Sequence, residues 1–289
     1  MRASIAIMRQ PSLIGLLMVT PALLLLAALF LYPLVFSLIS AFTVERSDAP
    51  APTFGLFNFF NAYELYATDI LFTVVIVGVS TLLIGLFAVA IGGYLTLGET
   101  ALAVAVLRWL YRWPLFIPFI VAAQCMRSFL AKNGLMNTAL EAAGLLDPLS
   151  AQSFLDWRGI IITFVWKQTP FVALLVAGAM ASIDRSTIEA ARNLGASRLR
   201  ALVEIIVPQV QQILVVGLVL SFVTMMSVLS VPIMISGNTP TMMTVDMAFR
   251  INAYGDYGTA NALGLISYVL TGAVAWIYVR RGVRQGTPP

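Results

Sequence analysis

Six long apolar runs alternate with shorter polar segments along the chain, and this alternation is its dominant pattern. A helix needs about 20 apolar residues to cross the hydrocarbon core of a bilayer. The pattern therefore predicts an all-α, polytopic membrane protein in which residues 1–289 form one transmembrane domain. We place the six spans at about 14–41, 71–95, 107–130, 159–182, 209–231 and 261–279.

Two of these runs allow a second interpretation. Arg108 and Arg112 lie early in the third run and Trp113-Pro114 can kink it, so residues 100–112 can instead form a separate amphipathic helix. The first run follows Arg2 and Arg9, as a signal peptide would, but it is far longer than the usual apolar core of about 7–15 residues. We therefore expect an uncleaved membrane anchor.

The positive charges indicate the orientation, because cytoplasmic loops of membrane proteins are enriched in Lys and Arg. With a cytoplasmic N-terminus, the inner segments hold Arg2, Arg9, Arg108, Arg112, Arg185, Arg192, Arg198, Arg200, Arg280, Arg281 and Arg284. The outer segments then hold only Arg46, Arg127, Lys132, Arg158 and Arg250. Both termini and the loop 183–208 are therefore expected in the cytoplasm.

Composition supports a bilayer as the main solvent of this chain. It is 60% hydrophobic and 10% charged, whereas soluble domains carry about 25% charged residues. The net charge of +4 comes from arginines at the ends of apolar runs, so it does not indicate nucleic-acid binding. One cysteine and no histidine exclude a disulfide framework and leave no expected metal site or bound cofactor.

The loop 183–208 reads as helix, turn, helix. Ser186 and Glu189 have capping-box spacing, Gly195 suits a helix end, Ser197 can cap a second helix, and Pro208 suits the start of the next span. One face of this loop is apolar and the other carries arginines. A compact amphipathic segment of this kind suits docking into a groove on another protein.

Within this loop, Glu189-Ala190-Ala191, Gly195, Ile205 and Val207-Pro208 resemble the EAA motif of binding-protein-dependent ABC importer permeases of type I. Only Val207, which stands where the motif has Leu, departs from the pattern. The portion from about Phe116 onward most resembles the spermidine/putrescine, iron and phosphonate group of these permeases. By this resemblance, the residues that couple to the ATPase are Glu189, Ala190, Ala191, Arg192, Gly195, Ala196, Arg198, Ile205 and Pro208.

The resemblance also implies partners and a location. Two ATP-binding cassette ATPase subunits would dock on the cytoplasmic loops, an extracellular or periplasmic binding protein would deliver the solute, and a second permease subunit would complete the path. A different chain is favoured for this second subunit over a copy of the same one. The expected location is a bacterial inner (plasma) membrane. The chain has no phosphate-loop motif, so ATP and Mg would be bound by the partner ATPase.

Lys167 is the one clear ionisable residue inside a predicted span, where such residues are usually functional. With Gln168 and Thr169 it can form part of the translocation path, or it can extend outward to the membrane interface. Ser221, Thr224 and Ser227 recur on one span, where such stripes more often mediate helix packing. The weaker candidates are Gln124, Arg127, Asn238, Asp246, Arg250 and Asn252.

The solute stays open at this point: an organic anion or phosphonate, a polyamine, or a sugar. Lys167 disfavours a polycation, because like charges repel strongly in a low-dielectric passage. A secondary transporter driven by an ion gradient is the alternative function, but the thirteen acidic residues all lie outside or at the edges of the six runs. A membrane-embedded enzyme would need a catalytic set that the chain lacks, so we expect a transport subunit and no enzyme.

Overall fold

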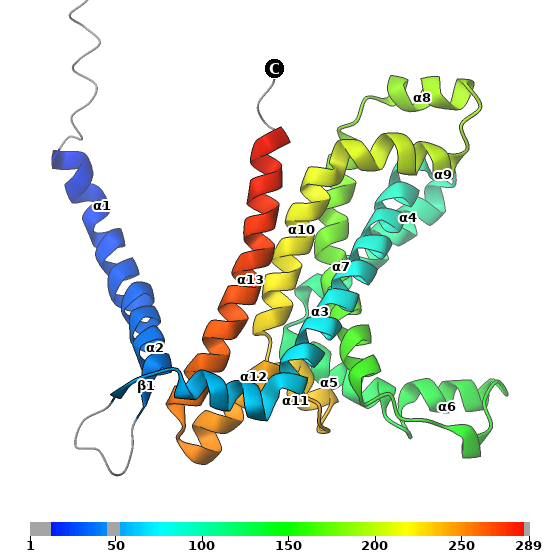
Figure 1. Ribbon diagram of the computed structural model, residues 1–289. Coiled ribbons are helices and arrows are strands. Elements are labelled where there is room, and N and C mark those ends of the chain that lie inside the picture. Colours follow the sequence, from blue (N-terminus) through cyan, green and yellow to red (C-terminus); the bar gives the residue numbers. More distant parts are fainter. Residues whose placement is uncertain (1–12, 45–52, 286–289) are drawn as a thin grey trace, which may run out of the picture.

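The computed structural model describes residues 13–44 and 53–285, and this part of the chain is almost entirely helical (Figure 1). Its first half contains α1 (Leu13–Leu26), a π-helical turn η2 (Ala27–Leu31), α2 (Tyr32–Phe42), α3 (Phe57–Leu97), α4 (Ala101–Leu110), the 3₁₀ turn η3 (Trp113–Phe116), α5 (Phe119–Leu130), α6 (Leu135–Ala142) and the 3₁₀ turn η4 (Pro148–Ser150). Two short antiparallel strands, β1 (Thr43–Val44) and β2 (Thr53–Phe54), pair between α2 and α3.

The second half is also helical. It contains α7 (Trp157–Ala181), α8 (Arg185–Asn193), α9 (Arg198–Ala201), the π-helical turn η5 (Leu202–Ile206), α10 (Val207–Ser227), α11 (Ser230–Ile235), α12 (Met243–Phe249), the π-helical turn η6 (Arg250–Tyr254) and α13 (Tyr257–Gln285). Helix α1 begins and α13 ends at the end of the bundle that carries α8, which we call the α8 end (Figure 1). Helices α6, α11 and α12 lie at the opposite end, which we call the α12 end.

Within residues 13–44 and 53–285, five helices are long and apolar enough to cross a membrane: 18–42, 57–97, 157–181, 198–227 and 257–277. A sixth span arises if the bent pair 101–116 and 119–142 counts as one. The fold is therefore all-α and polytopic, with five or six spans in the described residues.

Helix α7 is the centre of the bundle. In the apolar 18-residue stretch of α7, 61% of the residues are buried, whereas 0% are buried in the corresponding stretch of the helix 18–42. Ile160, Phe164 and Val172 of α7 belong to the main core cluster together with Val77 and Ile84 of α3. The two helices approach closely where a glycine replaces a side chain: a Cβ on Gly92 would lie 3.0 Å from the Met180 sulfur.

Helices α1 and α2 stand apart from this bundle and join it only near its α12 end (Figure 1). There the Ser37 hydroxyl donates a 2.6 Å hydrogen bond to the Asn261 side-chain oxygen of α13. Away from this contact, large apolar side chains of the first span, such as Leu24, Leu29 and Phe36, are exposed in the isolated chain. The first span therefore has an apolar surface for lipid or for another subunit.

The third predicted span, 107–130, is not one helix. Residues 101–116 and 119–142 meet at 110°. Pro118 causes the break because a proline disfavours helical geometry in the residue before it, and Ile117 has extended angles of φ −91° and ψ 121°. The separate helix that the sequence allowed over 100–112 is present as α4 (Ala101–Leu110).

Candidate coupling loop and translocation path

The loop between α7 and α10 begins with a helix cap that the sequence analysis assigned wrongly. The cap of α8 is the Asp184 carboxylate, which accepts a 3.0 Å hydrogen bond from the Ser186 backbone N–H. This bond holds the pKa of Asp184 below its ordinary value. Only the third helical residue can reach back to a cap, and with Asp184 as cap that residue is Thr187. Glu189 lies too far along the helix for the predicted role.

The end of α8 has the predicted glycine geometry. Gly195 has φ +87°, its N–H donates to the Arg192 carbonyl at 2.9 Å, and the Ala196 N–H donates to the Ala191 carbonyl at 3.0 Å. This pair of bonds is the Schellman motif, in which a left-handed residue ends a helix. Ser197 then caps α9, as expected, by accepting a bond from the Arg200 N–H at 3.3 Å.

Pro208 lies at the first positions of α10, as expected. However, α10 is not separated from the segment before it, because one continuous helix runs from 198 to 227 through the π-helical turn Leu202–Ile206. A proline lacks an N–H and crowds the carbonyl four residues earlier. We attribute the wider turn to this local conflict.

The loop lies at the α8 end of the bundle, and part of its surface is exposed. Ile188 and Ile206 are buried against the core, and Ile205 is half-buried. In contrast, Leu194 is 90% exposed and Leu199 is 70% exposed. Of the other motif residues, Ala191 and Ala196 are half-buried, while Glu189, Ala190, Arg192, Arg198 and Pro208 are exposed. The loop therefore offers apolar and charged groups together to a second protein.

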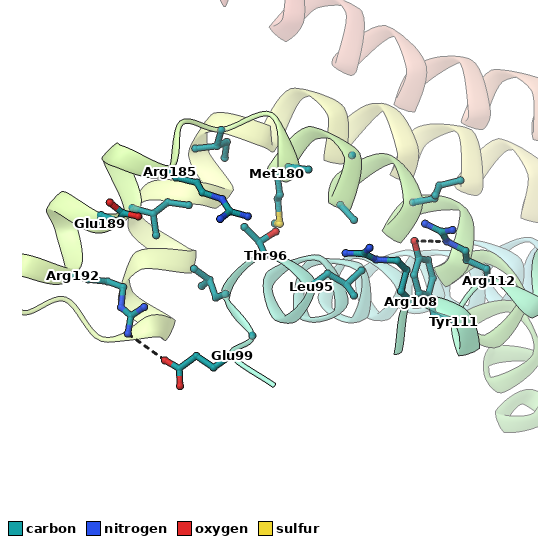
Figure 2. Close-up of a pocket in the computed structure, with 18 residues that line it drawn as sticks. Leu95, Thr96, Glu99, Arg108, Tyr111, Arg112, Met180, Arg185, Glu189 and Arg192 are labelled. Carbon is teal, nitrogen blue, oxygen red and sulfur yellow. Dashed lines mark hydrogen bonds and ion pairs between the residues drawn. The ribbon is translucent and has the colours of Figure 1, made fainter. Parts of the chain in front are cut away.

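Glu99, in the turn after α3, is a residue that the sequence analysis missed. Its carboxylate forms an ion pair with Arg198 and a second one, at 3.5 Å, with Arg192 (Figure 2). The hydrogen bond and charge of Arg198 hold the pKa of Glu99 below its ordinary value. Glu99 is the sole acidic residue between the second and third apolar runs, and this isolated charge was the available signal.

Lys167 is enclosed within the bundle. Only 7% of it is exposed, its Nζ lies 3.4 Å from the Leu115 carbonyl oxygen, and it lies 5.1 Å from the ring centroid of Phe119. The ammonium group is therefore directed at the break in the third span. The second interpretation required this group to extend to an exposed surface, and it does not.

Other predicted path residues divide into two groups. Gln168, Thr169 and Ser221 are buried, and the hydroxyls of Thr169 and Ser221 have no hydrogen-bond partner among the described residues. In contrast, Thr224 and Ser227 donate to backbone carbonyls of their own helix, at 2.8 and 2.9 Å. The predicted stripe is therefore a single buried hydroxyl followed by two that bond locally.

Ser221 lies level with the polar part of α7. A Cβ on Gly217 of α10 would lie 3.2 Å from Val172 of α7, and the two helices run in opposite directions (Figure 1). One turn, about 3.6 residues, leads from Gly217 to Ser221 and from Val172 back to Gln168. The two helices thus bring polar groups to one level of the bundle.

Three of the six weaker candidates make hydrogen bonds within the chain. Arg127 donates to the Met234 carbonyl at 3.0 Å, Asn252 donates to the Ala248 carbonyl at 2.7 Å, and Arg250 donates to the Tyr66 hydroxyl at 2.6 Å. Gln124 and Asn238 are exposed. These contacts give the residues at the α12 end a structural role.

Asp246 is buried, and one of its carboxylate oxygens has no partner in the described part of the chain. Burial and, to a smaller extent, the charge of Asp69 raise the pKa of Asp246, the charge of Arg250 opposes them, and the net value is about 7. Asp69 itself accepts a 2.6 Å hydrogen bond from the Thr241 N–H. Two carboxyl groups therefore lie in one electrostatic environment at the α12 end.

Comparison with known proteins identifies relatives over most of the chain. No protein-family model matches it. It is 27% identical over 287 residues to the sulfoquinovosyl glycerol transport system permease protein SmoG of Agrobacterium fabrum, with 93% of this chain and 90% of that protein covered. It is also 27% identical to the trehalose/maltose transport system permease protein MalF of Thermococcus litoralis, with 93% of each covered. The spermidine/putrescine transport system permease protein PotB of Haemophilus influenzae is 25% identical over 58% of each chain.

Solved structures show the same fold. A bacterial ABC transporter involved in the import of the acidic polysaccharide alginate has a TM-score of 0.77, with 20% identity and 95% and 96% of the two chains covered. A bacterial alginate ABC transporter in complex with its pentasaccharide-bound periplasmic protein has a TM-score of 0.75 at 18% identity, with 92% of each chain covered. Neither the relatives nor these structures support the ion-gradient alternative. The chain is a permease subunit of an ABC importer, and so an integral membrane protein.

Proposed function

We propose that this chain forms half of the path by which an importer moves a small solute across a bacterial inner membrane, with the α8 end in the cytoplasm. The clustering of arginines supports this orientation: α4, the turn after it, α8 and α9 together carry Arg108, Arg112, Arg185, Arg192, Arg198 and Arg200. Positive charge is retained on the cytoplasmic side of membranes. Both ends of the described chain lie at this end (Figure 1).

The exposed surface of the loop supports its role as the docking site for an ATPase subunit. Two such subunits, one for each permease, would bind ATP and Mg and move the loops when they close. Leu194 and Leu199 supply exposed apolar contacts, and Glu189 supplies a carboxylate without a partner among the described residues. Because α9 continues into the 198–227 helix, a push on the loop is transmitted directly into the membrane.

A second permease subunit and a solute-binding protein complete the proposed assembly. The apolar 18-residue stretch of the first span is 0% buried. This uncovered apolar surface supports a partner within the membrane. The binding protein would dock at the α12 end, where α6 projects from the bundle (Figure 1).

We assign Lys167, Gln168, Thr169 and Ser221 to the solute path, and we favour an anionic or neutral carbohydrate-like solute. Lys167 is the group that carries this choice, because a buried ammonium attracts an anion and repels a polycation. The relatives named for a sulfonated sugar glycerol and for neutral disaccharides cover more of the chain than the polyamine relative does. Thr224 and Ser227 are expected to support the helix instead.

The decisive test is the ATPase activity of the reconstituted complex, which should rise when binding protein and solute are both present. In that assay Glu189→Lys should reduce ATPase docking and transport, because it reverses a charge on the exposed α8 surface. Glu64→Lys, an exposed position at the start of α3, is the matched control. Normal docking and uptake in Glu189→Lys would refute the coupling role.

The orientation has a separate test. In a Cys125→Ser background, Arg198→Cys should react with an impermeant maleimide only from the cytoplasmic side. Asn238→Cys, which is exposed in the segment between α11 and α12, should react only from the outside. The reverse pattern would exclude the proposed orientation.

A further inference from the structure

A cavity of about 660 Å³ opens at the α8 end of the bundle (Figure 2). Its walls come from the end of α3, from α4, from the end of α7 and from α8. Small-molecule sites commonly have volumes of about 300–1,000 Å³. The cavity is therefore large enough for a ligand, and it lies far along α7 from the polar residues Lys167 and Gln168.

The lining of this cavity is strongly basic. Four arginines, Arg108, Arg112, Arg185 and Arg192, face two glutamates, Glu99 and Glu189. Glu99 already forms ion pairs with Arg192 and Arg198, so it does not neutralise the other three. The cavity thus keeps an excess of positive charge.

Two of these arginines have no partner in the described part of the chain. Neither Arg108 nor Arg185 makes a hydrogen bond or ion pair with any described residue, and Figure 2 shows their guanidinium groups directed from opposite sides towards Thr96 and Met180. Two unpaired guanidinium groups directed at one space repel each other unless an anion lies between them. Arg108 comes from α4 and Arg185 from α8, so such an anion would connect the third span to the coupling loop.

We propose that this cavity binds a phosphate-bearing anion between Arg108 and Arg185. Guanidinium groups match the geometry of phosphate oxygens through paired hydrogen bonds. The Tyr111 hydroxyl accepts a 3.3 Å bond from Arg112, which leaves its own O–H to donate to the ligand. Leu95 and Met180 line the same space, and apolar walls strengthen the attraction by excluding water.

The phosphate can belong to an anionic lipid headgroup or to a free phosphate, since the cavity lies at the α8 end, which the proposed orientation puts at the cytoplasmic surface of the membrane. Basic pockets between spans on the cytoplasmic side are suited to anionic headgroups. The ligand would hold α8 at a set distance from α4. Binding requires neither ATP nor the transported solute, so the site can be tested separately from transport.

The experiment compares the full-length chain, purified with any subunits that co-purify, in vesicles of phosphatidylcholine with and without phosphatidylglycerol. Native mass spectrometry would measure retained phosphatidylglycerol. A second arm in detergent would compare thermal unfolding in sodium phosphate and in sodium chloride of equal ionic strength. The variant Arg108→Gln/Arg185→Gln should lower binding at least about tenfold, because two charge-assisted contacts are removed.

The matched control is Arg200→Gln, an exposed arginine of α9 outside the cavity. It should retain the ligand as the unmodified chain does. The charge-conserving Arg108→Lys/Arg185→Lys variant should bind more than the Gln pair, which separates loss of the ligand from a folding defect. Lipid retention alone identifies a headgroup, and a phosphate-specific thermal shift alone identifies the free ion. The proposal is overturned if neither occurs, or if Arg200→Gln loses binding equally.

Discussion

The Lys167 ammonium of α7 lies 3.4 Å from the Leu115 carbonyl oxygen, directly before the 110° break of the third span. That carbonyl lies in the 3₁₀ turn Trp113–Phe116, where regular helical bonding is interrupted. A single side chain thus connects the most enclosed helix of the bundle to the place where another span bends. We infer that the contacts of Lys167 depend both on the solute and on the geometry of this break.

Lys167→Met should raise the KM for an anionic solute about tenfold or more, because a charge-assisted contact in the path is lost. It should leave the KM for a neutral sugar nearly unchanged. Uptake by vesicles containing the reconstituted importer measures both values. Lys132→Met, at an exposed position after α5, is the control, and equal changes for both solutes would limit Lys167 to a structural role.

Gly195→Val should impair the coupling loop. A β-branched residue at φ +87° is strained by at least about 1–2 kcal/mol relative to glycine. Co-purification of the ATPase and uptake should both fall, while membrane insertion is retained. Gly195→Asn is the matched variant, because asparagine tolerates left-handed angles better. If the two substitutions behave alike, the turn conformation does not matter for docking.

Glu99→Gln should release Arg192 and Arg198 from their shared carboxylate and make the loop easier to cleave. Limited trypsin digestion after these arginines should be faster than in the unmodified chain. Glu204→Gln is the control, since Glu204 pairs only with Arg200 among the described residues. The pKa of Glu99 is lowered, so its ion pairs are complete above the ordinary value of 4.5 and weaken only as the pH falls through the lowered pKa. Titration of Glu99 should therefore add no pH dependence to the cleavage rates near neutrality.

Asp246→Asn should change how stability depends on pH. Because burial raises the pKa of Asp246 from 3.8 to about 7, the folded chain holds a proton that the unfolded chain releases within this interval. Stability contributed by this group is complete below 3.8 and is lost as the pH rises through about 7. Asp69 and Arg250 are the charged groups that act on it.

The Asn variant should therefore unfold at a higher temperature than the unmodified chain at alkaline pH, by an amount that corresponds to a few kcal/mol at about 1.36 kcal/mol per pKa unit. The two should converge in acid. Thermal unfolding in detergent across this range provides the measurement, with Glu64→Gln as an exposed acidic control. A constant difference at all pH values would contradict the assignment.

Several features of the fold and the loop follow from short stretches of sequence. An apolar run of sufficient length must be a helix in a bilayer, because each backbone polar group needs a partner within the segment. This argument predicted the polytopic all-α fold. Gly195 and Ser197 were also identified correctly, because a Schellman turn and an N-cap depend on a few neighbouring residues.

The start of α8 shows how a local argument can fail. Asp184 and Ser186 are both acceptable caps two residues apart, and Asp184 is the one used. Asp184 has the extended backbone angles of a cap, φ −62° and ψ 123°, whereas Ser186 already lies inside α8. The third span shows a related limit: the sequence analysis placed its possible kink at Trp113-Pro114, whereas the chain breaks at Pro118, and either proline can kink or end a helix.

Contacts between distant segments were beyond the reach of the sequence. Glu99 lies 93 positions from Arg192, and Lys167 lies 52 positions from Leu115. Such pairs exist because helix packing places α8 beside the end of α3 and places α7 beside the 3₁₀ turn Trp113–Phe116. Local hydrogen bonding and hydrophobic length are written into neighbouring residues, whereas the partner of a buried charge depends on how whole helices pack, and only the tertiary structure contains that information.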